Sequence, residues 1–440
     1  MKFVLNVIQY FRGVDMKRAL VLSGGGAKGS YQVGVYKALR KLRIKIDIIT
    51  GTSIGSINGA LFTAGDYLKA KRLWLTISTN NLFDQKFDSV KDLQGVASEI
   101  LKNKGLKFDK AEGFLNKIIS ESKIRKSRID YGLVTVNLKT MVPKMLTKNM
   151  IPKGKLVSYI IASSTCFPAV EMKEIDGNYY IDGGYYDNLP INLAVDMGAD
   201  EIIAVDLSAV GIKQKVKDKN VKIDYIKNKS KQRFTLDFDT DTALRNIRMG
   251  YNDTMKHFDK LDGDKYTFKK GHLSKNYDVI SDYYIKLIKK ILLSDSKKVK
   301  ITEILTNKRY QNIFLNIKQG KSIETEVNKS LEYLGSLFDI DIDNIYSIRK
   351  FNNLLIREAK SLNYIKLDKK LKGKMLVGYI YNQYMDSDDK ERVYKRLFNI
   401  ALVFQKDFLA ALYLIAISSK YPITLKSDKF FDEILSTIKK

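Results

Sequence analysis

The stretch Arg18-Ala19-Leu20-Val21-Leu22-Ser23-Gly24-Gly25-Gly26-Ala27-Lys28-Gly29 begins with a short apolar run and ends in a glycine-rich segment. Apolar residues then recur with helical spacing in residues 31–42. This order predicts a buried strand, a glycine loop and an amphipathic helix. The order is repeated directly afterwards, because residues 46–49 are apolar, Ser53 lies in a turn and residues 56–64 have helical spacing. Repeated strand–turn–helix units predict a parallel sheet covered by helices.

Further strands and helices extend this pattern to about residue 207. Residues 130–138 alternate as a strand does, and residues 156–163 have helical spacing. Asp176-Gly177-Asn178 predicts a hairpin turn between strands at 171–175 and 179–181. A helix at 191–197 precedes a buried strand at 200–207. Residues 211–232, which are rich in lysine and asparagine, are predicted to be a loop, and a helix is expected over 242–258.

The character of the chain changes near residue 273. Beyond this point strand-like alternation fades, and helical spacing dominates in residues 283–293, 323–337 and 394–418. We therefore expect an N-terminal extension at 1–16 and an α/β domain at 17–272, a three-layer α/β/α arrangement with a mainly parallel central sheet. Residues 273–440 are expected to form an all-helical C-terminal domain.

Composition limits the classes of partner and compartment. The chain has 440 residues and a net charge of +28, which would attract an anionic membrane or a nucleic acid. The lysines are spread over both halves of the chain, which favours a solvated surface, so nucleic acid is not expected as a partner. The chain shows neither a signal-peptide pattern nor a segment long enough to span a membrane. A cytoplasmic protein is expected, and peripheral contact with an anionic membrane is compatible with this charge.

Cys166 is the single cysteine of the chain. An internal disulfide and a cysteine-rich zinc site are therefore excluded, and the thiol is expected to be a small buried group. Histidine, cysteine and acidic residues are not clustered at spacings typical of metal ligands, so no metal is expected.

Ser53 lies in the segment Gly51-Thr52-Ser53-Ile54-Gly55. A nucleophile on a sharp strand-to-helix turn has strained backbone angles, and side chains two residues before and after it would collide. Taken by itself, the segment is equally compatible with a structural turn. Both histidines, His257 and His272, lie far downstream and are expected to be surface or packing residues. A serine nucleophile in this chain would therefore work without histidine.

The loop Gly24-Gly25-Gly26-Ala27-Lys28-Gly29 begins a predicted helix, where backbone N–H groups and Lys28 favour negative charge. These features suit an oxyanion hole. The glycine spacing also matches a dinucleotide-binding loop, and Asp47 lies about as far along the chain as the ribose-binding acid would. The loop alone leaves the two alternatives balanced. The later Ser53 and Asp182 segments favour the oxyanion hole.

Asp182 is the candidate proton acceptor. It ends the second arm of the predicted hairpin, and Gly183 and Gly184 would allow it to approach a neighbouring strand end closely. The alternative is that Asp182 only shapes a turn.

Taken in order, the glycine loop, the Gly51–Gly55 segment and Asp182-Gly183-Gly184 resemble the motifs of the patatin-like phospholipase family. Within this family, the chain resembles the bacterial acyl hydrolases. The resemblance covers residues 17–207 and extends weakly to about residue 270. It implies that Ser53 is the nucleophile of a Ser-Asp dyad, that Asp182 accepts its proton and that the glycine loop binds the oxyanion. The implied activity is hydrolysis of carboxylic esters of lipids, phospholipid or lysophospholipid, through an acyl-enzyme in lipid metabolism or degradation, without a cofactor.

Two other functions stay open on the sequence. The same fold could serve as a scaffold whose C-terminal helices recruit partners. Alternatively, the loop from Gly24 to Gly29 could bind a nucleotide without any hydrolase activity.

Overall fold

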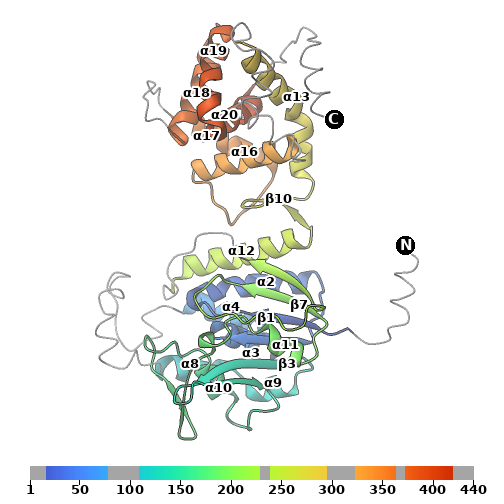
Figure 1. The fold of residues 1–440 in the computed structure, drawn as a ribbon, viewed down its shortest axis with the longest axis vertical. Helices are drawn as coiled ribbons and strands as arrows, with labels where there is room; N and C mark the ends of the chain where they lie inside the picture. Colours follow the sequence, from blue (N-terminus) through green and yellow to red (C-terminus); the bar gives the residue numbers. More distant parts are fainter. Residues whose placement is uncertain (1–15, 78–108, 228–237, 295–322, 363–371, 420–440) are drawn as a thin grey trace, which may run out of the picture. The chain divides into compact units, whose positions relative to one another are not determined.

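The computed structural model describes residues 16–77, 109–227, 238–294, 323–362 and 372–419. It divides into two compact units, Met1–His257 and Phe258–Lys440 (Figure 1). The expected N-terminal extension lies outside the described residues except for Met16. The sequence placed a domain boundary near residue 273, whereas the compact units divide before Phe258. The earlier division follows from two short strands at 261–269 that pair within the second unit.

The first unit is built on an eight-stranded sheet with the order β5-β6-β3-β2-β1-β7-β8, and β4 pairs with β3. The strands are β1 (Arg18–Leu22), β2 (Ile48–Thr52), β3 (Asp130–Asn137), β4 (Pro143–Thr147), β5 (Lys173–Ile175), β6 (Asn178–Asp182), β7 (Glu201–Asp206) and β8 (Lys222–Lys227). The pairs from β3 through β2, β1 and β7 to β8 are parallel. Among the described strands of this sheet, the pairs β3–β4, β3–β6 and β5–β6 are antiparallel, so the prediction of a mainly parallel sheet is confirmed.

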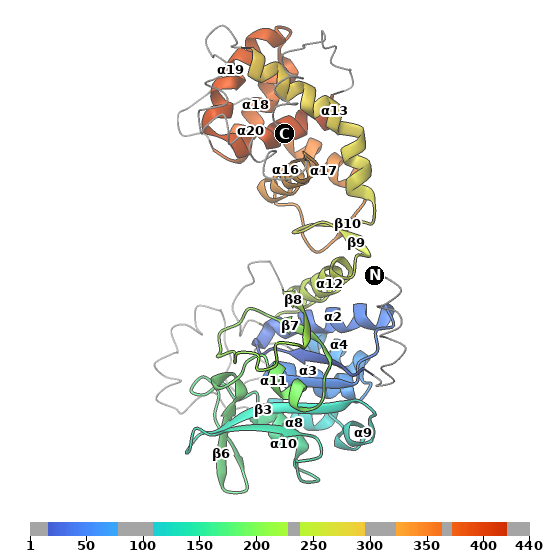
Figure 2. The same cartoon turned by 45° about the vertical axis from the view of Figure 1, so that its right-hand side comes forward.

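Helices cover both faces of this sheet, as the two views in Figures 1 and 2 show. Alternation along β1 sets the two faces: Ala19 and Val21 pack in a core cluster with α11 (Ile191–Asp196), while Leu22 points towards Gly59 of α3 (Ile54–Thr63). The three-layer prediction is therefore confirmed. The other helices of this unit are α2 (Ser30–Lys41), α4 (Tyr67–Thr76), α8 (Asp109–Ile118), α9 (Glu121–Lys126), α10 (Leu156–Ala162) and α12 (Thr240–His257).

Strand β8 corrects one prediction, because residues 211–232 were expected to form a loop. Residues 222–227 instead pair in parallel with β7 at the edge of the sheet. Of this strand only Ile226 is buried, and Lys222 and Lys227 are exposed. Charged side chains are typical of sheet edges, where they prevent pairing with other chains. Because this strand has few buried apolar residues, its sequence does not show the apolar alternation by which strands are predicted.

Helices α2 and α12 pack closely because glycine lies at their contact. A Cβ added to Gly34 would lie 2.0 Å from the Ile247 carbonyl oxygen, and one added to Gly250 would lie 2.0 Å from the Tyr31 carbonyl oxygen. Since backbone atoms cannot move aside locally, a side chain at either position would push the helices apart.

We expect Gly34→Ala to lower the free energy of unfolding of this unit by at least about 2 kcal/mol. The buried Trp74 is the only tryptophan of the chain, so its fluorescence during urea unfolding reports on this unit alone. Gly113→Ala is the matched control, because a Cβ there meets nothing within 4 Å and its helical position tolerates alanine. Equal unfolding midpoints for the two variants would contradict the close helix contact.

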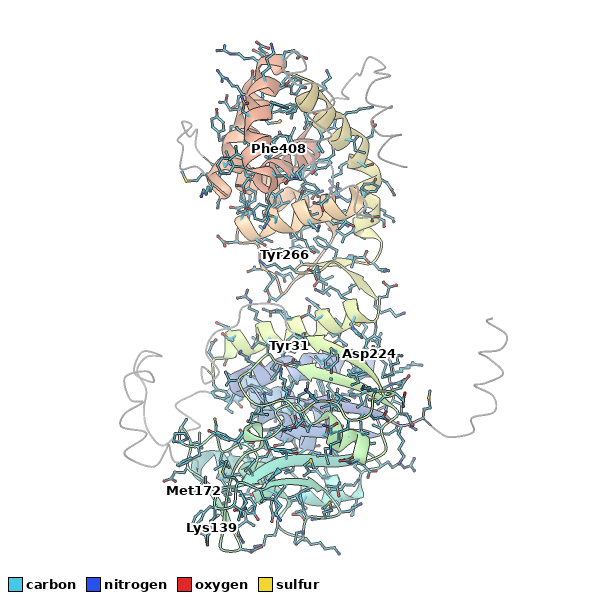
Figure 3. All side chains as sticks on the ribbon, viewed as in Figure 1. Tyr31, Lys139, Met172, Asp224, Tyr266 and Phe408 are labelled. Atoms are coloured by element: carbon cyan, nitrogen blue, oxygen red, sulfur yellow. The ribbon has the colours of Figure 1, made fainter. Side chains whose placement is uncertain are left out.

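In its described residues, the second unit is helical apart from a three-stranded sheet of order β11-β10-β9. Its described elements are β9 (Leu261–Asp262), β10 (Thr267–Lys269), α13 (His272–Leu293), α16 (Ile323–Leu337), β11 (Ile345–Tyr346), α17 (Ile348–Lys360), α18 (Lys374–Asp386), α19 (Lys390–Val403) and α20 (Gln405–Ser418). Its core includes the fully buried Phe408 and Tyr266, which Figure 3 labels. Within the described part of the chain, every helix is too short or too polar to cross a membrane.

Candidate active site

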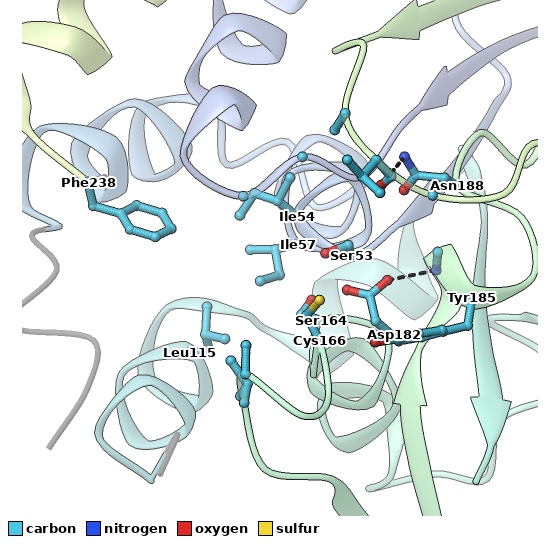
Figure 4. Close-up of a pocket in the computed structure, with 18 of the residues that line it drawn as sticks. Ser53, Ile54, Ile57, Leu115, Ser164, Cys166, Asp182, Tyr185, Asn188 and Phe238 are labelled. Carbon is cyan, nitrogen blue, oxygen red and sulfur yellow. Dashed lines mark hydrogen bonds between the residues drawn. The ribbon is translucent and has the colours of Figure 1, made fainter. Parts of the chain in front are cut away.

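A cavity of about 670 Å³ opens in the first unit at the carboxyl ends of the central strands. Ligands of open α/β sheets bind at this edge of the sheet. The cavity lining includes Ser53, Asp182, Gly25 and Gly26, which come from three separate sequence motifs (Figure 4). The fold therefore brings together residues that are far apart in the sequence.

Ser53 lies between the end of β2 and the start of α3. Its backbone has φ 56° and ψ −130°, a strained conformation for a residue with a side chain. The backbone N–H of Ser53 donates to the Ser163 hydroxyl over 3.0 Å, and the Ser163 hydroxyl donates to the Val134 carbonyl oxygen over 2.7 Å. These bonds hold the turn. The Ser53 hydroxyl does not cap α3, and it lies in the cavity.

Gly51 and Gly55 make this turn sterically possible. A Cβ on Gly51 would lie 2.3 Å from the Gly55 carbonyl oxygen, and a Cβ on Gly55 would lie 2.3 Å from the Leu22 carbonyl oxygen. Both contacts are with backbone atoms, so larger residues at these positions would break the turn. The structure therefore supplies the steric reason for glycine two residues before and after Ser53.

The register of the sheet explains how Asp182 comes near Ser53. Thr52 pairs with Val134 on β3, and the next residue of β3, Thr135, pairs with Asp182 at the end of β6. Gly183 then passes close to β3, because a Cβ there would lie 2.2 Å from the Val134 carbonyl oxygen. Asp182 is thereby separated from β2 by the single strand β3, with its carboxylate next to Ser53 (Figure 4).

The Asp182 carboxylate is buried and accepts a hydrogen bond from the Gly184 N–H over 2.7 Å. Desolvation by burial raises the pKa of Asp182 to about 6, and hydrogen bonds from the Ser53 side chain and the Gly184 N–H partly oppose this rise. A carboxyl with a pKa of about 6 is a stronger base than an ordinary aspartate and is still ionised at neutral pH.

The glycine loop contributes to the site through two of its residues. Gly25 and Gly26 line the cavity, at the start of a short 3₁₀ turn (Gly26–Gly29) that leads into α2. The Gly24 N–H donates to the Asn188 carbonyl oxygen over 3.1 Å, and the Lys28 N–H donates to the Gly25 carbonyl oxygen over 3.2 Å. Of the described residues, Gly24, Ala27, Lys28 and Gly29 support the loop without lining the cavity.

Asn188 is a lining residue that the sequence analysis did not identify. Its buried side chain touches three glycines, because a Cβ on Gly24 would lie 2.3 Å from its Oδ1, one on Gly211 would lie 2.7 Å from its Cβ, and one on Gly184 would lie 3.2 Å from Oδ1. Asn188 therefore joins the glycine loop to the Asp182 segment and to the loop after β7. Such a role depends on contacts between distant segments, so sequence patterns carry no signal for it.

One side of the cavity is lined by apolar side chains. In Figure 4, Leu115 and Phe238 lie beyond Ile54 and Ile57 as seen from Ser53. The apolar residues that line this side are Ile54 and Ile57 of α3, Leu73 of α4, Ile77 directly after α4, Phe114 and Leu115 of α8, and Phe238 just before α12. A hydrocarbon chain would be removed from water along this side.

Cys166 corrects another prediction, because it is exposed in the cavity and not buried in the core. Desolvation, together with the charge of Asp182, raises the pKa of the Cys166 thiol to about 11. The thiol is therefore protonated near neutral pH, and thiolate chemistry is not favoured.

The histidines lie away from the described lining of the cavity. His257 is the last residue of α12, and its Nε2 lies 3.7 Å from Oδ1 of Asp224 on β8. His272 Nδ1 accepts a hydrogen bond from the Ile348 N–H over 3.2 Å. Among the residues that the structure describes, His, Cys, Asp and Glu form no group of three that could hold a metal ion. In the described part of the cavity, the carboxyl of Asp182 instead accepts a hydrogen bond from the Ser53 side chain.

Comparison with known proteins finds sequence similarity over much of the first unit. Residues 20–195 match the family model of patatin-like phospholipases. Patatin-like phospholipase domain-containing protein 6 of Homo sapiens is 32% identical over 199 residues, which cover 43% of this chain and 13% of that protein. Lysophospholipase nte1 of Aspergillus terreus is 32% identical over 198 residues, covering 43% and 12%. The chain thus spans about an eighth of the length of these relatives. Among solved structures, VipD from Legionella pneumophila is 13% identical over 93% of both chains, with a TM-score of 0.34.

Proposed function

We propose that the protein is a carboxylic ester hydrolase acting on lipids, because residues 20–195 match the family model of patatin-like phospholipases. The observation that carries this proposal is the common cavity, in which a strained serine, a buried carboxylate and a glycine loop lie beside an apolar lining. The proposed substrates are phospholipid and lysophospholipid, and the proposed role of the enzyme is in lipid metabolism or degradation. The relative from Aspergillus terreus is named a lysophospholipase, which supports the second substrate.

The proposed reaction begins with attack of the Ser53 hydroxyl oxygen on the ester carbonyl carbon. Asp182 accepts the serine proton, and the backbone N–H groups around Gly25 and Gly26 stabilise the negative charge on the carbonyl oxygen. The alcohol leaves with a proton returned by Asp182, which leaves an acyl group on Ser53. Water, deprotonated by Asp182, then attacks the acyl carbon. The bond to the Ser53 oxygen breaks, Asp182 returns the proton to that oxygen, and the fatty acid is released. The raised pKa of Asp182 supports this role, since a base works best when its pKa is near the operating pH.

We expect the purified chain to release fatty acid from phospholipid or lysophospholipid dispersions and to hydrolyse p-nitrophenyl esters. A carbonyl group beside Ser53 would place its chain along Ile54, Ile57 and Leu115, so longer acyl chains should lower KM by burying more apolar surface. Free fatty acid and p-nitrophenol are measured over a series of acyl lengths. The absence of ester hydrolysis with every substrate would contradict the proposed function.

A further inference from the structure

The loop that follows β7 forms part of the cavity mouth, and we call residues 208–219 the interface loop. Ala209, Val210, Gly211 and Ile212 line the cavity. The Val210 side chain is fully exposed and Ile212 has 54% of its surface exposed. Tyr185, on the neighbouring segment of the lining, is also exposed. Apolar side chains thus face water beside the opening through which a substrate must pass.

The backbone of the interface loop is held firmly against the segment that follows Asp182. The Ile212 N–H donates to the Gly184 carbonyl oxygen over 3.0 Å, and the Ile212 carbonyl oxygen accepts from the Asn188 N–H over 2.6 Å. The Asn192 side chain adds two bonds, donating to the Lys215 carbonyl oxygen over 2.9 Å and accepting from the Lys217 N–H over 3.0 Å. We call Ala209–Ile212 the apolar tip of the interface loop. Its backbone is fixed by these hydrogen bonds, so little conformational entropy is lost when the tip binds a partner.

Lysines follow the apolar tip at every second position. Lys213, Lys215, Lys217 and Lys219 are all exposed, and Asp218 is the acidic residue among them. A hollow of about 320 Å³ is lined by Lys213, Lys215 and Lys217, together with Asn192 and Asp187. Lys213 pairs with Asp206 over 2.8 Å, and the Asp187 carboxylate accepts the Leu189 and Gln214 N–H groups. Lys215 and Lys217 add further positive charge along this hollow.

We propose that the interface loop docks the first unit onto an anionic lipid surface. Val210 and Ile212 enter the boundary between headgroups and acyl chains, while Lys215 and Lys217 contact headgroup phosphates. Apolar side chains flanked by lysines suit an anionic bilayer. Burial of the apolar side chains and electrostatic attraction of the lysines to anionic headgroups both contribute to the free energy of binding. The inference rests on the proposed lipid substrate, because docking beside the cavity mouth lets an acyl chain enter without crossing water.

The test uses the full chain with Ser53→Ala, which leaves the vesicles intact. Sedimentation measures binding to vesicles of phosphatidylcholine with and without phosphatidylglycerol. We expect stronger binding to the anionic vesicles, and a weakening of about 30-fold when Lys215→Gln and Lys217→Gln are added. Val210→Ser with Ile212→Ser should weaken binding by about tenfold, on both kinds of vesicle.

The matched control is Lys17→Gln with Lys45→Gln, which removes the same charge. These lysines precede β1 and β2, at the amino ends of the strands and so at the edge of the sheet opposite the cavity. Their replacement should change vesicle binding by less than about threefold. Equal weakening by the two lysine pairs, or no vesicle binding by the Ser53→Ala chain, would overturn the proposed docking.

Hydrolysis of a soluble p-nitrophenyl ester separates this inference from the proposed function. With Ser53 intact, Lys215→Gln with Lys217→Gln should leave this rate unchanged and reduce only the rate on anionic vesicles. Ester hydrolysis without vesicle binding would refute docking and leave the hydrolase standing. Vesicle binding without ester hydrolysis would refute the hydrolase.

Discussion

Ser53→Ala should lower kcat for ester hydrolysis by about 10⁶-fold, because the attacking oxygen is removed and the remaining groups cannot form the acyl-enzyme. The variant should remain folded. Alanine differs from serine only by the hydroxyl, and the Ser53 contact that holds the turn is made by its backbone N–H. KM for a soluble ester should change little, since the apolar lining is retained.

A fluorophosphonate probe gives a direct second measurement, because it forms a covalent adduct with an activated serine. The wild-type chain should be labelled and the Ser53→Ala chain should not. Ser164→Ala serves as a control, since Ser164 also lines the cavity but its hydroxyl donates to the Ile160 carbonyl oxygen over 3.1 Å. This control should keep the adduct. Equal labelling of the wild-type and Ser53→Ala chains would exclude Ser53 as the nucleophile.

The arrangement of the parallel strands was predictable because each strand–turn–helix unit carries its own local signal. The glycine loop follows β1 and Ser53 follows β2, and these two strands are neighbours in the sheet. Carboxyl ends of parallel strands meet at one edge, so their meeting follows from the pattern alone. The sequence could therefore predict this half of the candidate site.

The approach of Asp182 was harder to predict, because it depends on antiparallel pairing across a long separation in the sequence. Strand β6 pairs with β3, and only the register Thr135–Asp182 places the carboxylate beside Ser53. Local patterns predict the hairpin of β5 and β6, but they do not say which strand it joins. The order of the motifs resembles a known family, and this resemblance supplied the expectation.

The differences in the lining of the cavity share one physical cause, which is that exposure depends on distant parts of the chain. Cys166 was expected in the core, yet it lines a cavity whose other walls come from α3, α8 and the loop after β7. Phe238 lines the same cavity from a position just before α12 and stacks on Trp74 with ring centroids 6.1 Å apart. Periodicity within one segment cannot report such contacts.

Asp182→Asn should lower kcat by about 10³- to 10⁴-fold, because the amide cannot accept the serine proton. The substitution keeps the shape of the side chain and an oxygen to accept the Gly184 N–H. In the wild-type chain, kcat/KM should be constant at neutral pH and fall about tenfold per pH unit below pH 6, since protonation of Asp182, with its pKa of about 6, removes the base. Rates on a soluble ester across this pH range give both measurements.

Asp187 is the control that gives the pH profile its meaning, because burial also raises the pKa of its carboxyl to about 6. Its carboxylate accepts the backbone N–H groups of Leu189 and Gln214, and it does not line the cavity that holds Ser53. Asp187→Asn should therefore keep the inflection near pH 6 and most of the activity, whereas Asp182→Asn should abolish the inflection. If the inflection disappeared with Asp187→Asn and persisted with Asp182→Asn, the base would be Asp187 and the proposed Ser53–Asp182 dyad would be refuted.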